Sequence, residues 1–123
     1  MIDHVGIKVS SFKNSLSFYT AALEPVGYTI KYEGNTTAGF AARGDIDFWM
    51  EEAVPTQALH LAFHTENREI VDRFYHAAIQ AGGKDNGKPG LRPHYHKNYY
   101  AAFVFDPDGN NIEVVCHKPT TEL

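Results

Sequence analysis

The residues of this chain best suited to metal chemistry are His4, His60 and Glu113. The two histidines open segments of one pattern, because residues 4–11 read HVGIKVSS and residues 60–67 read HLAFHTEN. Glu113 lies between apolar neighbours in NNIEVV, where an unpaired carboxylate is costly to bury. Two imidazoles and a carboxylate can hold a divalent ion and leave positions open for water or substrate. We predict one such ion, and Zn, Ni, Mn and Fe suit these ligands equally.

Each of these residues also has a purely structural interpretation. A strand histidine is often a hydrogen-bonded rim residue, and Glu113 could be a salt-bridged acid; the matching repeat positions favour the joint metal site. Aligning the turn glycines Gly44 and Gly109 makes Phe48 the first-copy equivalent of Glu113. The first copy therefore supplies a histidine but no matching carboxylate ligand. Trp49, one residue later, is expected on the other face, in the core.

A second polar cluster follows in the Gly/Pro-rich segment 85–98, which we predict to be a loop. It combines cations, imidazoles and phenols that could cover a bound ligand, namely Arg92, His94, His96, Lys97, Tyr99 and Tyr100. We expect His96 and Tyr99 to be the catalytic residues that handle protons. A solvated loop is the alternative interpretation.

The elements that must position these residues repeat along the chain. Alternating apolar residues predict a strand at the start of each copy, and a 3.6-residue period then predicts helices over 12–24 and 68–81. Further strands are predicted at 28–33, 37–43, 46–51, 99–105 and 110–117. By alternation, Lys8 and His64 share the face of the histidine ligands, although a strand end that reaches solvent explains them as well. The repeat divides one domain into modules of about residues 1–53 and 54–123.

Composition excludes several classes of function. The 123 residues are 43% hydrophobic and 21% charged, which is ordinary for a globular domain. The net charge is −4 with scattered Lys and Arg, so we expect no nucleic-acid partner. The start MIDHVGIKVS resembles neither a signal peptide nor a membrane span, and the single cysteine, Cys116, cannot form an internal disulfide. We expect a cytoplasmic protein without membrane contact.

The duplicated pattern, with His4 in DHVGIKV, His60 in LHLAF and Glu113 in DPDGNNIEVV, resembles the vicinal oxygen chelate superfamily. This superfamily includes glyoxalase, fosfomycin-resistance proteins, extradiol dioxygenases and bleomycin-resistance proteins. The resemblance implies an α+β fold in which two tandem βαβββ modules form an open barrel-like mixed sheet, with helices on the outer face. It also implies a homodimer, in which His4 could meet His60 and Glu113 of the partner subunit.

The chain departs from individual members of the superfamily in informative ways. Glyoxalases usually have a carboxylate in both modules, whereas we expect Phe48 at the first-module position. In the extradiol dioxygenase signature, His96, the turn at 106–109 and Glu113 fit, but Phe103 stands at the tyrosine position. The ligand pattern is most similar to that of the fosfomycin-resistance thiol transferases, without their dense set of anion-binding residues. Bleomycin-resistance proteins bind their ligand without a metal.

The resemblance therefore implies a divalent-metal-dependent enzyme that acts on a small oxygen-chelating substrate as a lyase or isomerase, a thiol transferase or a dioxygenase. A non-catalytic protein that binds or sequesters small molecules is one alternative, and a dimeric interaction module is another. The residues expected to contact substrate are Lys8, Phe48, His64, Arg92 and Phe103.

Overall fold

The computed structural model describes residues 1–120 and contains two strand-helix-three-strand modules. The first comprises β1 (Val5–Val9), α1 (Phe12–Leu23), a short 3-10 helix η1 (Glu24–Val26), β2 (Thr29–Glu33), β3 (Thr37–Ala41) and β4 (Phe48–Glu52). The second comprises β5 (His60–His64), α2 (Arg68–Gln80), β6 (Lys84–Leu91), β7 (Tyr100–Phe105) and β8 (Asn111–Cys116). The expected α+β class with two βαβββ modules is confirmed.

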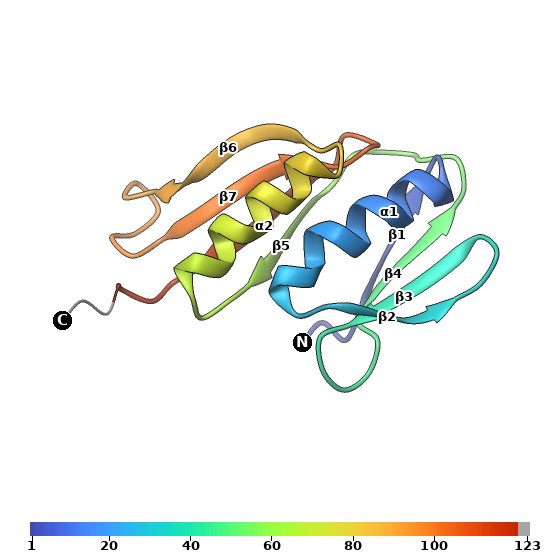
Figure 1. Ribbon diagram of the computed structural model, residues 1–123, viewed down its shortest axis with the longest axis horizontal. Helices are drawn as coiled ribbons and strands as arrows, with labels where there is room; N and C mark the ends of the chain where they lie inside the picture. The colour runs from blue at the N-terminus through green and yellow to red at the C-terminus, as the bar shows by residue number, and fades with distance from the viewer. Residues whose placement is uncertain (121–123) are drawn as a thin grey trace.

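Each module forms one open four-stranded mixed sheet. The strand orders are β1-β4-β3-β2 and β5-β8-β7-β6, and the first pair in each order is parallel while the others are antiparallel. The two helices lie side by side over one side of the sheets (Figure 1), and α1 contacts α2. The opposite side of each sheet carries the residues with candidate chemistry. Within residues 1–120, no helix is long and apolar enough to cross a bilayer.

The helices begin where the sequence provides capping side chains. The Ser11 hydroxyl accepts a hydrogen bond from the Asn14 amide, and Asn67 Oδ1 accepts one from the Glu69 amide, so each helix has one of its free N–H groups satisfied. Both helices agree with the predicted ranges within one or two residues.

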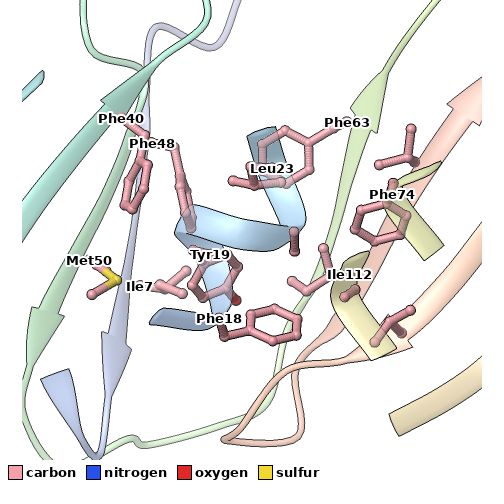
Figure 2. Close-up of a cluster of buried hydrophobic side chains, with 14 of the residues drawn as sticks. Ile7, Phe18, Tyr19, Leu23, Phe40, Phe48, Met50, Phe63, Phe74 and Ile112 are labelled. Carbon is pink, nitrogen blue, oxygen red and sulfur yellow. The ribbon is translucent and has the colours of Figure 1, made fainter. Parts of the chain in front are cut away.

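One continuous core joins the modules. Figure 2 shows Phe18, Tyr19 and Leu23 of α1 between the side chains of the first sheet and those of the second, such as Phe63 and Ile112. These side chains are buried, and the rings of Phe18 and Tyr19 meet edge to face at 5.0 Å. Burial of apolar surface from both modules in a single cluster favours folding as one unit.

Hydrogen bonds connect the turn between β7 and β8 to α1 and to the residue before β5. Asp106 is 5% exposed, and its carboxylate accepts hydrogen bonds from the amides of Asp108 and Asn110, from the Asn110 side chain and from the Tyr19 hydroxyl. Burial, and then the Asp106 charge, raise the pKa of Tyr19 well above its ordinary value, so its hydroxyl remains a donor. Asn110 Oδ1 in turn accepts from the Leu59 amide just before β5. The turn therefore fixes β5 and β8, the two strands that carry His60 and Glu113.

The prediction of a loop over 85–98 is wrong for its first half. Residues 84–91 form the edge strand β6, paired with β7 through two shifts in register, between Asp85 and Gly87 and between Gly87 and Gly90. Gly87 has a φ of 150°, a conformation that side chains rarely adopt. Bulges and an edge position let this Gly/Pro sequence pair with a neighbouring strand.

The register also corrects the alignment of the two modules. Gly6 pairs with Trp49 on β4, as Ala62 pairs with Glu113 on β8, so Trp49 is the counterpart of Glu113. Phe48 corresponds to Ile112; both are fully buried on the helix-covered face. The predictions that Phe48 is the counterpart of Glu113 and that Trp49 lies in the core were therefore wrong, although Phe48 does line a cavity beside His4. The reason is that one more residue separates Gly44 from Phe48 than separates Gly109 from Ile112. The extra residue moves each side chain of β4 to the opposite face from the one predicted.

Candidate metal centre

His60 and Glu113 lie together on the open side of the second sheet. β5 and β8 are parallel neighbours, and the Glu113 Cα lies opposite Ala62, two residues beyond His60. His60 Nε2 is 3.0 Å from Glu113 Oε1. The imidazole is half exposed, whereas Glu113 is only 2% exposed. The structure thus supplies a buried carboxylate with an imidazole that reaches it from solvent.

The hydrogen bonds of His60 determine which nitrogen faces the carboxylate as an acceptor. His60 Nδ1 is 3.0 Å from the backbone oxygen of Asn111, and because a carbonyl can only accept, Nδ1 must carry the proton. If the ring is neutral, Nε2 then has no hydrogen and is an acceptor beside Oε1; if the ring is protonated, Nε2 pairs with the carboxylate as a cation. Two acceptors at this distance repel each other unless a proton or a cation lies between or beside them.

A divalent ion fits this arrangement. With metal–ligand bonds of about 2.1 Å, two ligand atoms at a right angle around one ion lie about 3.0 Å apart, and Nε2 and Oε1 have this separation. A bond from Nδ1–H to a carbonyl is also the usual support of a metal-bound imidazole, because it fixes the tautomer and the ring orientation.

Two aromatic side chains surround the pair. Phe103 lies opposite Glu113 on β7, and its ring is near-parallel to that of His60 with centroids 6.3 Å apart. Tyr99 reaches Glu113 from the segment before β7, and its hydroxyl donates to Oε2. Burial, and then this hydrogen bond, raise the pKa of Tyr99 above its ordinary value, so the hydroxyl keeps its proton.

Arg92, expected to contact substrate, braces the edge strand. Its guanidinium donates to the carbonyls of Gly90 and Lys88, each at 2.8 Å, and lies over the Phe103 ring at 5.4 Å. Phe103 thus contacts Arg92 and also the imidazole of His60. With both terminal nitrogens already bonded to carbonyls, Arg92 is better placed to orient Phe103 than to bind an anion.

His4 does not join the pair within one chain. Its imidazole is 56% exposed, bonds to Asp3 at 2.7 Å, and lines a cavity of about 290 Å³ with Phe63 and His64 at the end of β5. His60 begins β5, and four residue steps along a strand span about 13 Å. Among residues 1–120, accordingly, no cluster of three or more His, Cys, Asp or Glu side chains has a geometry for binding a metal.

The imidazole of His96 is joined to that of His117, a residue that the sequence analysis did not single out. His96 Nδ1 accepts from the Asn98 amide at 3.0 Å, so in the neutral ring Nε2 carries the proton and donates to His117 Nδ1 at 2.9 Å. His64 stacks on His117, with centroids 5.9 Å apart. Alternation from Glu113 through Val115 places His117 on the site face, which is the signal that could have identified it.

The open side of the first sheet carries Lys8 and Trp49. Both line a hollow of about 320 Å³ together with Gly6, Thr37 and Glu51. Gly39 lies beneath the indole, because a Cβ there would come within 2.8 Å of the Trp49 ring. Lys8 therefore lies on the module that lacks the carboxylate, and it lines a different hollow from His4.

The model of the Glyoxalase/Bleomycin resistance protein/Dioxygenase superfamily matches residues 1–114. The chain belongs to this superfamily. No protein of curated function matches the sequence.

Solved structures share the superfamily fold over nearly the whole chain. A glyoxalase/bleomycin resistance protein from Albidiferax ferrireducens T118 has a TM-score of 0.82 at 26% identity, and the match covers 93% of this chain and 97% of that one. A glyoxalase-related enzyme from Fulvimarina pelagi has a TM-score of 0.74 at 16% identity, covering 94% and 87%. The E144Q mutant of glyoxalase I from Zea mays has a TM-score of 0.69 at 22% identity, covering 93% of this chain and 46% of that one. A superfamily fold supports several activities, so function must be argued from the site.

Proposed function

We propose that this protein is a divalent-metal-dependent enzyme of the superfamily that acts on a small oxygen-chelating substrate. The observation that carries the proposal is the pair formed by His60 Nε2 and Glu113 Oε1, 3.0 Å apart, with the imidazole held by its other nitrogen. The bond from Nδ1–H to the Asn111 carbonyl supports the proposal, because it leaves Nε2 as the nitrogen that can bind an ion beside Oε1.

We further propose that His4 of a second copy completes the site. His4 lies beside His64 near the end of β5, whereas His60 begins that strand. Exposed apolar residues adjoin both halves, because Ile2 near His4 is 80% exposed and Leu59 beside His60 is 37% exposed. In a two-fold dimer the same contact occurs twice, so both sites would be completed together and this apolar surface would be covered.

The residues of the site have distinct tasks in this proposal. His4, His60 and Glu113 would hold the ion; Phe103 would orient the His60 ring and form an apolar wall. When bound, such an ion supplies Lewis-acid chemistry, because it accepts two substrate oxygens and stabilises negative charge as it develops. His96 remains our predicted proton-handling residue.

A thermal-shift screen tests the proposed function. We expect a divalent metal together with one class among 2-oxo acids, catechols, phosphonates and thiol conjugates to raise the melting temperature by on the order of 10 °C, since a ligand at a hundredfold excess over its Kd adds about 2.7 kcal/mol. The class that shifts the protein should then be turned over. His60→Ala is the control and should lose the shift.

The alternative, a protein that sequesters a small molecule without turnover, predicts a different result. The same compound would then stabilise wild type and His60→Ala equally, with or without a chelator, and no product would form. That outcome would replace the enzyme proposal.

A further inference from the structure

The Tyr99 hydroxyl reaches Glu113 from outside the regular register of the sheet. The residue opposite Glu113 on β7 is Phe103, which has no polar group, and Tyr99 precedes β7 by one residue. Its side chain nevertheless extends along the open side of the sheet and donates to Glu113 Oε2. This contact therefore depends on the conformation of the segment before β7 as well as on sheet pairing.

The two carboxylate oxygens of Glu113 consequently have different partners. Oε1 faces His60 Nε2 at 3.0 Å, and Oε2 accepts the Tyr99 hydrogen. Glu113 is almost fully buried, so rotation of the carboxylate would break the bond to Tyr99 in a poorly hydrated place. Because Oε2 already accepts this hydrogen bond, Oε1 is the oxygen that faces His60 and is better placed to bind a cation beside it.

The Tyr99 ring is held by three other rings. Tyr95 packs at 4.7 Å between centroids, His117 at 5.3 Å and His96 at 5.5 Å, all at steep angles to the phenol. The hydrogen bond between His96 and His117 links two of these neighbours. Rings on several sides thus hold the phenol beside Glu113.

We infer that Tyr99 is a positioning residue that limits Glu113 to one-oxygen coordination and thereby makes the site select small transition-metal ions over Ca²⁺. The inference rests on the metal site of the proposed function. Ca²⁺ takes six to eight oxygen ligands and often binds a carboxylate through both oxygens. Imidazole nitrogens and one carboxylate oxygen suit Zn²⁺ or Ni²⁺.

Tyr99→Phe tests the inference, and Tyr100→Phe is its matched control. The Tyr100 hydroxyl also donates to a carboxylate, that of Asp72 on α2, at 2.6 Å, so the control removes a similar bond from the adjacent residue without touching Glu113. Competition with a chelator would give the zinc affinity, and calorimetry the Ca²⁺ affinity. X-ray absorption of the zinc-loaded protein would give the number of oxygen neighbours.

In Tyr99→Phe we expect zinc affinity to fall by about 10–100-fold, as for loss of other partners of metal ligands. The preference for zinc over Ca²⁺ should narrow, and the zinc spectrum should gain an oxygen neighbour. Tyr100→Phe should match wild type in all three measurements.

Two failures are distinguishable. Wild-type zinc affinity and coordination in a folded Tyr99→Phe variant would overturn the role of Tyr99 and leave the metal site intact. A folded wild-type protein that binds no zinc at all would overturn the proposed metal site itself.

Discussion

Chains carrying His4→Ala and chains carrying His60→Ala should each lack metal when purified alone and regain it when combined in one dimer. In a mixed dimer, the His60→Ala chain contributes an intact His4 to the intact His60 and Glu113 of the other chain. One complete site and one doubly damaged site result. The mixed dimer should therefore bind half as much metal as the wild-type dimer.

This expectation follows from where the structure places His4. It lies at the end of β5 with His64, whereas the His60–Glu113 pair lies at the other end of that strand. Co-expression of differently tagged chains, followed by two affinity steps and metal analysis, isolates the mixed dimer. If His4 instead served its own chain, both sites of the mixed dimer would be damaged, and an absence of metal would contradict the account.

Asp106→Ala should cause the largest loss of stability. The substitution removes an acceptor of four hydrogen bonds and leaves the buried Tyr19 hydroxyl and Asn110 side chain without this partner. Each buried group left unsatisfied costs about 1–3 kcal/mol. We expect a total loss of about 3–5 kcal/mol, which is a large part of the roughly 5–15 kcal/mol of a typical domain.

Urea unfolding measures this loss. Asp108→Ala is the control, because the Asp108 carboxylate accepts one exposed hydrogen bond, from the Ser10 amide at 3.0 Å. This substitution should lower the free energy of unfolding by less than about 1 kcal/mol. Tyr19→Phe should fall between the two, since it removes a single bond of the turn. Equal midpoints for Asp106→Ala and Asp108→Ala would show that the turn does not join the modules as described.

The fold was predictable because its signals are local and repeated. Alternation in HVGIKV and HLAFH, the caps Ser11 and Asn67, and the turn at 106–109 each specify one element, and the repeat specifies their order. Strand β6 was missed because edge strands with bulges tolerate glycine and proline, so the composition of 84–91 resembles that of a loop.

The site was predictable only in part. Alternation and the Gly109 turn brought attention to His60 and Glu113, which the structure places together. The repeat made His4 and His60 equivalent, but it did not indicate how β1 and β5 lie relative to each other. The start of β1 lies beside the end of β5, so His4 and His60 are at opposite ends of β5. Which sides of the sheet Phe48 and Trp49 occupy depended on one residue in the preceding loop. The contact of Tyr99 with Glu113 follows neither a strand nor a helix period, so no sequence pattern indicated it.

Metal analysis of wild-type protein purified without chelators, beside His60→Ala, tests the metal centre most directly. We predict about one divalent ion per chain in wild type, held by His4, His60 and Glu113, and none in the variant. Loss of this ligand should exceed the roughly 10–100-fold that loss of an outer partner costs. A folded wild-type protein without metal near neutral pH, or a His60→Ala protein that retains the full metal content, would contradict it.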